Sequence, residues 1–135
     1  MSVEIDHLGI AVRSIEEGLR FYEQSLGMQV AHRESVSAER VNVAMLPASG
    51  LAAGPRIELL EATDEQSTIA KFIAKRGPGL HHIALRVDDL AATVERMKAD
   101  GARLLNEPRT GAGGHTYVFV HPASSGGVLV ELIQK

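Results

Sequence analysis

The stretch LHHIALRV at residues 80–87 decides the fold, because it restates DHLGIAV at residues 6–12. His82 follows His7 by 75 positions in the two stretches. Apolar and polar residues alternate well enough in both to predict a strand. With a period of two, His7 points away from the apolar face that carries Leu8, Ile10 and Val12. The chain is therefore predicted to be built from two copies of one unit.

Each copy continues in the same order, with a helix and then three strands. In the first copy, Ser14 with Glu17 forms a capping box that begins a helix, and Gly27 ends it. In the second copy, Asp89 caps the helix and Gly101 ends it. The predicted strands are residues 3–12, 29–35, 41–46 and 56–61 in the first copy, and 80–87, 102–106, 115–120 and 128–133 in the second.

This order predicts an α+β fold of two tandem βαβββ modules, residues 3–62 and 79–135, joined by a linker helix within residues 63–78. The two modules should form one curled mixed sheet around a metal-binding cleft, with the helices outside. A loop is expected at residues 47–54, which are rich in Ala and Gly. At 135 residues the whole chain, 1–135, is expected to be a single domain.

Charge and composition exclude several classes of function. A net charge of -3 gives no basic surface for nucleic acid or for an anionic membrane. With no cysteine, the chain has neither disulfides nor thiolate metal ligands, so any metal must be bound by nitrogen and oxygen. No apolar run approaches the length of a membrane span and the N-terminus is acidic, so the protein is expected to be cytoplasmic.

One His and one Glu recur in each copy at nearly matched spacing. Glu58 follows His7 by 51 positions, and Glu131 follows His82 by 49. Both carboxylates lie in apolar strands, where burial without a cation, a partner or a proton costs several kcal/mol. Two interpretations remain open: a single divalent metal ion bound by two imidazoles and two carboxylates, or two separate His–Glu salt bridges.

Several longer motifs point to a known family. They are DHLGIAV from Asp6, GLRFYEQSLGM from Gly18, RIELLE from Arg56, KFIAKRGPGLHHIAL from Lys71, EPRTGAGG from Glu107 and HPASSGGVLVELIQK from His121. Over its whole length the chain resembles the vicinal oxygen chelate superfamily and, within it, the methylmalonyl-CoA epimerases. The motifs from Lys71 and His121 are the ones most specific to the epimerases.

The resemblance implies a homodimer that binds one divalent metal ion per chain at His7, Glu58, His82 and Glu131. Cobalt is the first choice, with zinc, nickel, manganese and magnesium as alternatives. Some family members have Gln where this chain has Glu58, so the site here carries one more negative charge. The implied substrate is an acyl-CoA thioester, whose α proton is removed and returned on the other face.

Such a reaction needs a base on each face of the planar intermediate. The resemblance implies that Glu131 is one base and that the other is a Glu just before the third strand. The family's Glu commonly falls on Ala38, one position before Glu39 in this chain. A slip of one residue reverses the face of a strand, so either a bulge turns Glu39 inward or this base is missing. Glu34 is the alternative to Glu39.

The other titratable residues are weaker candidates. His81 is expected to be a hydrogen-bonded histidine on the face opposite His82, His115 to be a solvated residue or a carboxylate binder, and His121 to fix a turn. Basic residues on the linker helix, at Lys71, Lys75 and Arg76, are candidates for coenzyme A phosphates but are more often merely solvated.

Two other functions compete with the epimerase. The first is a glyoxalase I acting on a thiol hemithioacetal, which would use the same four ligand types. The second is a small-molecule binding protein of the resistance type, which generally lacks these ligands. The C-terminal motif and the pair His81–His82 favour the epimerase.

Overall fold

The computed structural model describes residues 2–49, 54–111 and 114–135, and it divides into two compact units. The first-copy unit is His7–His81, and the second-copy unit combines Met1–Asp6 with His82–Lys135. Two strands, β1 (Val3–Ala11) and β5 (Gly79–Val87), each begin in one unit and continue into the other.

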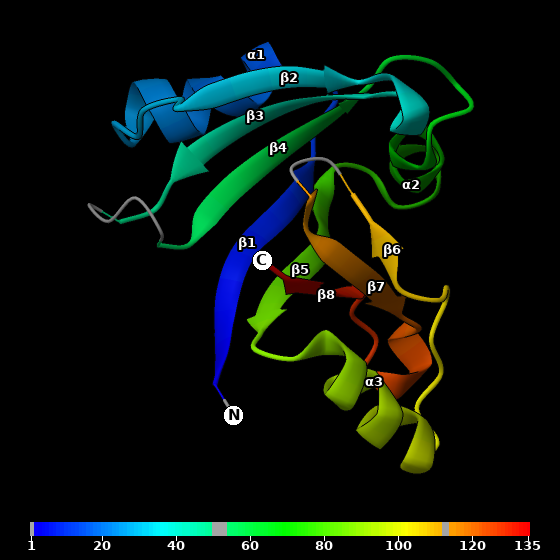
Figure 1. Cartoon of the computed structure of the whole chain (residues 1–135). Coiled ribbons are helices and arrows are strands. Elements are labelled where there is room, and N and C mark those ends of the chain that lie inside the picture. Colours follow the sequence, from blue (N-terminus) through cyan, green and yellow to red (C-terminus); the bar gives the residue numbers. More distant parts are fainter. Residues whose placement is uncertain (1, 50–53, 112–113) are drawn as a thin grey trace. The chain divides into compact units, whose positions relative to one another are not determined.

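In the first-copy unit the strand order is β2 (His32–Val36), β3 (Val41–Pro47), β4 (Arg56–Ala62) and β1. The β1–β4 pair is parallel and the other two pairs are antiparallel. One face of this sheet packs against α1 (Ile15–Leu19), and the other packs against Ile69 of α2 (Thr68–Arg76) (Figure 1). The linker helix predicted within residues 63–78 is therefore present.

In the second-copy unit the strand order is β5, β8 (Val130–Gln134), β7 (Thr116–Val120) and β6 (Arg109–Thr110). The β5–β8 pair is parallel, and the β8–β7 and β7–β6 pairs are antiparallel. A single helix, α3 (Leu90–Ala99), packs on one face, where Leu90 and Val94 meet apolar side chains of β5, β7 and β8. A short 3-10 helix, η4 (Pro122–Ser124), connects β7 to β8.

The internal duplication is visible in the strand register and in the helix caps. Gly9 pairs with Glu58 in the first copy, and Ala84, 75 positions after Gly9, pairs with Glu131 in the second. Ser14 and Asp89 cap α1 and α3 by accepting a hydrogen bond from a backbone N–H three residues later. The prediction of two copies, each with strand, helix and three strands, is confirmed.

A second pair of caps reinforces the duplication. The backbone N–H of Ile15 donates to the Glu61 carboxylate at 2.8 Å, and that of Leu90 donates to the Gln134 amide oxygen at 2.7 Å. In both copies the last strand thus satisfies a free donor at the start of the helix.

The predicted strand at residues 102–106 is wrong. Only a single bridge forms there, between Leu104 and Val120, and the strand paired with β7 is β6 instead. The side-chain oxygen of Asn106 accepts the backbone N–H of Phe119, which replaces a ladder hydrogen bond. Pro108 then removes a backbone donor, so the ladder resumes only at Arg109.

Three smaller differences concern element boundaries. The strand predicted from residue 29 begins at His32, and the one predicted from residue 128 begins at Val130. The first helix continues past Leu19 as a π-helix, η1 (Arg20–Ser25), in which the N–H of Leu26 donates to the carbonyl of Phe21 at 2.8 Å. Gly27 ends it with φ +85°, as predicted. The predicted loop at 47–54 includes residues 50–53, which lie outside the described residues.

The α+β class, the mixed sheet and the position of α1 and α3 on the face opposite Glu58 and Glu131 are confirmed. The curl of the sheet, its cleft and the single domain stay predictions. Among the described residues, no helix is both long and apolar enough to span a membrane.

Gly18 sets how closely α1 approaches the sheet. A methyl group at this position would lie 2.8 Å from Cδ1 of Leu59, which is fully buried between α1 and β3. Gly18→Ala is therefore expected to lower the free energy of unfolding by about 1–3 kcal/mol, although alanine favours helices. Urea unfolding measures the change. Arg20→Ala, at an exposed position two residues further along the same continuous helix, is the control and should stay within about 0.5 kcal/mol of the wild type.

Candidate functional site

The first candidate pair joins β1 and β4. Nδ1 of His7 lies 3.1 Å from Oε2 of Glu58, and both side chains are about nine-tenths buried. Because Gly9 pairs with Glu58 and His7 lies two residues earlier on the same face, the parallel register places the two side chains diagonally adjacent. The prediction of a His and a Glu on one face of the first copy is confirmed.

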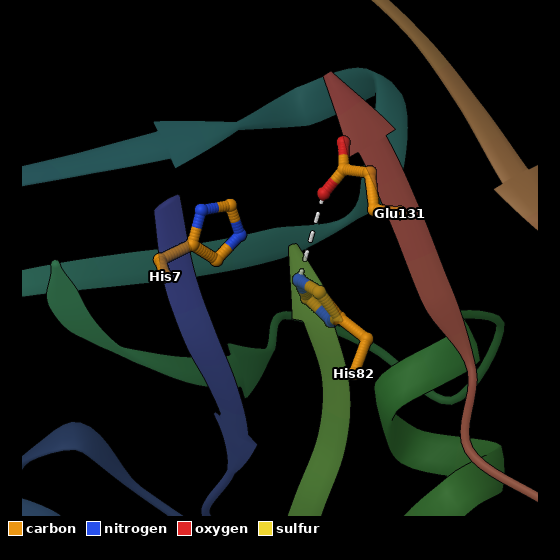
Figure 2. A group of neighbouring side chains, drawn as sticks. All are labelled: His7, His82 and Glu131. Atoms are coloured by element: carbon orange, nitrogen blue, oxygen red, sulfur yellow. Dashed lines mark ion pairs between the residues drawn. The ribbon is translucent and has the colours of Figure 1, made fainter. Parts of the chain in front are cut away.

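The second candidate pair repeats this geometry between β5 and β8. Nε2 of His82 lies 3.7 Å from Oε1 of Glu131, and their side chains are 9% and 12% exposed (Figure 2). Here Ala84 pairs with Glu131, and His82 again lies two residues earlier. The same diagonal step thus brings an imidazole and a carboxylate together in each copy.

These donors fit a divalent metal ion. Each pair offers a ring nitrogen and a carboxylate oxygen in a buried setting, the donor set that first-row ions such as cobalt and zinc accept. A bound cation would also compensate the cost of burying Glu58 and Glu131 among apolar neighbours. The spacing of the residues left a shared metal ion and two separate salt bridges open, and the ring nitrogen that faces each carboxylate is seen only in the structure.

Glu39 lies on a turn rather than on a strand. Ser37, Ala38 and Glu39 form a 3-10 helix, η2, between β2 and β3, so the alternation of a strand does not fix the direction of Glu39, whose side chain is exposed. The following residue, Arg40, is in the left-handed region with φ 56° and pairs with Asp64 at 3.2 Å. The backbone N–H of Arg40 also donates to the carbonyl of Ser37 at 3.2 Å, so contacts of Arg40 stabilise the turn that carries Glu39.

Glu34, the alternative base, lies on β2 opposite Val43 of β3. Val43 pairs in turn with Leu60, two residues from Glu58 on β4. Cross-strand partners share a face, so Glu34 lies on the same face as Glu58. Its carboxylate is 3.8 Å from Nε2 of His32.

The remaining histidines are accounted for by local contacts. His81 packs edge-on against Phe72 of α2 at 5.1 Å, and burial lowers the pKa of its imidazole. His121 fixes a turn, as predicted, because its Nδ1 accepts the backbone N–H of Ala123 at the start of η4. His115 lies just before β7, next to Tyr117. On α2, Arg76 lies over the ring of Phe72, and Lys71 and Lys75 are exposed.

One buried charge was missed by the sequence reasoning. Asp6 is 1% exposed, and its Oδ1 lies 2.9 Å from Nζ of Lys135 and 3.5 Å from Nη1 of Arg86. The sequence did mark this position, because Asp6 lies next to His7 in the repeated motif and the second copy has His81, not a carboxylate, at the equivalent position. Through these two ion pairs Asp6 connects the start of β1 to Arg86 of β5 and to the C-terminal Lys135, all within the second-copy unit.

Fold and site together define a class of duplicated βαβββ proteins with a buried histidine and glutamate in each copy. The model of the Glyoxalase/Bleomycin resistance protein/Dioxygenase superfamily matches residues 6–119. The chain belongs to this superfamily.

Within the superfamily the chain is similar to methylmalonyl-CoA epimerases. It is 36% identical over 132 residues to the mitochondrial methylmalonyl-CoA epimerase of Homo sapiens, covering 96% of this chain and 73% of the human protein. It is 37% identical over 131 residues to the uncharacterized protein YqjC of Bacillus subtilis, covering 96% of this chain and 91% of YqjC.

Among solved structures, a variant of the Streptomyces coelicolor methylmalonyl-CoA epimerase in complex with 2-nitronate-propionyl-CoA superimposes with a TM-score of 0.87 and 37% identity, covering 99% of each chain. The resemblance to the epimerases that the motifs indicated is confirmed.

Proposed function

We propose that this protein is a metal-dependent epimerase that interconverts the (R) and (S) forms of methylmalonyl-CoA. The observation that carries the proposal is the pair of buried His–carboxylate contacts, His7–Glu58 and His82–Glu131, at equivalent registers in the two copies. Similarity to the epimerases over nearly the whole chain supports this choice of reaction.

The proposed ligands of one divalent ion per chain are His7, Glu58, His82 and Glu131. His7, His82 and Glu131, the three side chains drawn in Figure 2, can each offer one ligand atom to such an ion. When bound, the ion supplies Lewis-acid stabilisation of the negative charge that develops on the thioester oxygen of the substrate. Cobalt as the native ion, the homodimer and the cytoplasmic location remain predictions.

Glu131 is the proposed base on one face of the substrate. Its carboxylate takes the proton from the carbon between the thioester and the free carboxylate, and the paired electrons delocalise toward the thioester oxygen. Return of a proton to the opposite face gives the other epimer. His82 lies beside Glu131, with Nε2 of its ring 3.7 Å from Oε1 of the carboxylate.

Glu39 is the proposed group on the opposite face. Glu39→Ala is expected to lower turnover by about 100-fold or more, the usual contribution of a positioned general base, with little change in metal affinity. Wash-in of deuterium should become restricted to one epimer, which NMR of the thioester detects.

Glu34→Ala is the matched comparison for Glu39→Ala, since both carboxylates are exposed and Glu34 lies on β2 just before the turn that carries Glu39. If Glu34→Ala causes the loss and Glu39→Ala does not, the role of second base belongs to Glu34. Unchanged turnover and symmetric exchange in both variants would leave the second face without a carboxylate base.

The function is tested by following exchange of the α proton of methylmalonyl-CoA in deuterium oxide with metal-loaded protein. A parallel assay with methylglyoxal and a thiol tests the glyoxalase I alternative. Exchange in the first assay is expected. Turnover only in the second assay would replace the epimerase with a glyoxalase, and a protein that binds no metal and is inactive in both would be a small-molecule binding protein.

A further inference from the structure

The strand β7 carries a row of aromatic side chains on the face that bears Glu131. Val118 and Val120 point to the other face, where they are buried with Leu90 of α3. Alternation then places Tyr117 and Phe119 on the same side as Glu131, and the register confirms it, because Phe119 pairs with Glu131. Tyr117 pairs with Ile133, which lies two residues after Glu131 on β8 and on the same face.

Ring contacts link this row to the His82–Glu131 pair. The ring of Phe119 meets that of His82 edge-on, with centroids 6.3 Å apart, and meets that of Tyr117 at 5.9 Å. The ring of His115 follows at 6.3 Å from Tyr117. A continuous series of rings therefore leads away from the proposed base.

The ring of Tyr117 also lies close to the backbone of Gly111. A Cβ added at Gly111 would lie 3.1 Å from Cε1 of Tyr117, so the backbone of Gly111 lies close against this ring. The ring of Phe119 also packs edge-on against that of Tyr117, so both neighbours restrict rotation of the Tyr117 ring. The rings of Tyr117 and Phe119 are half-buried, so part of their surface is open.

A half-buried ring surface beside a proton-transfer carboxylate suits an apolar group of the ligand better than its phosphates. Phe119 lies directly across from Glu131, while Tyr117 lies two residues further along β7, a step of about 6.6 Å. A methyl group on a carbon beside Glu131 is too short to span this step, whereas an alkyl chain of several carbons that lies along β7 is long enough to meet Tyr117.

We propose that Tyr117 is the residue that limits the size of the alkyl substituent on the reacting carbon of the thioester. This inference rests on the proposed function, since it assigns a wall of the same site. The protein should accept alkylmalonyl-CoA thioesters with short substituents and discriminate against those long enough to meet the fixed ring of Tyr117.

The test compares α-proton exchange of methylmalonyl-, ethylmalonyl- and butylmalonyl-CoA. Tyr117→Ala is expected to raise kcat/KM for butylmalonyl-CoA relative to methylmalonyl-CoA by about tenfold or more, in the range expected for methylene groups in an apolar pocket. Tyr117→Phe keeps the ring and should retain the wild-type ratio. Tyr117→Leu provides a second shortened side chain should the alanine variant fold poorly.

A binding measurement keeps the inference independent of turnover. The chain has two tyrosines, so Tyr22→Phe labelled with 3-fluorotyrosine gives a single fluorine signal, from residue 117. Butylmalonyl-CoA at saturating concentration should shift this signal more than malonyl-CoA, which has no alkyl substituent.

The outcomes separate the two proposals. If the wild type exchanges the α proton of methylmalonyl-CoA but Tyr117→Ala and Tyr117→Leu keep the wild-type substrate ratio, or if the fluorine signal responds equally to both thioesters, the role of Tyr117 is overturned and the epimerase remains. If the wild type exchanges the proton of none of the thioesters, the proposed function fails and the role of Tyr117 falls with it.

Discussion

Replacing Glu131 with Gln is expected to abolish exchange of the α proton of methylmalonyl-CoA while the protein still binds its ion. The amide of Gln keeps an oxygen that can ligate a metal, but it cannot accept a proton at neutral pH. The side chain would stay beside His82, because Gln is close in size to Glu. Loss of a positioned base should lower exchange by about 100-fold to 10,000-fold.

The duplication supplies the control for Glu131→Gln. Glu58 is the equivalent carboxylate of the first copy, at the same register and also next to a histidine. Glu58→Gln should retain exchange, because Glu58 is proposed as a ligand and not as a base. Exchange is followed by NMR in metal-replete samples of both variants. Wild-type exchange in Glu131→Gln would show that this carboxylate has only a structural role.

Removing either histidine is expected to abolish binding of the divalent ion. His7→Ala and His82→Ala each delete one of the two proposed imidazole ligands, which are 6% and 7% exposed. Loss of a group that merely orients a ligand typically costs 10-fold to about 100-fold in affinity, so loss of a ligand itself should exceed about 100-fold. Metal content after gel filtration and calorimetric titration with cobalt measure the change.

His32→Ala is the matched control, since His32 also lies beside a carboxylate, but its side chain is 56% exposed on β2. It should leave the metal content unchanged. If only one of His7 and His82 affects binding, the shared site is replaced by two separate His–carboxylate pairs. Crystals soaked with cobalt and showing no anomalous scattering near either pair would exclude the metal site altogether.

Much of the fold could be predicted because its signals are local. The two copies repeat at a fixed spacing, Ser14 and Asp89 mark the starts of their helices, and period-two alternation assigns each strand residue to a face. The same alternation placed Glu58 and Glu131 on the faces that α1 and α3 do not cover. For this reason the candidate ligands could be named before any contact between strands was known.

The tertiary structure decided what depends on pairing between distant segments. Asn106 and Pro108 shifted the edge strand of the second copy from residues 102–106 to β6, because a side-chain hydrogen bond replaced a backbone one. A similar limit applies to Glu39, whose direction is set by a 3-10 turn that alternation cannot anticipate.

The clearest case is the neighbourhood of the proposed base. The sequence by itself determined that Glu131 belongs to an apolar strand and has a counterpart in Glu58. Only the register of β7 on β8 placed Phe119 opposite Glu131 and its ring against that of His82. Register between strands depends on packing across the whole sheet and on the turns that join them, and a one-residue shift would have turned Phe119 to the other face.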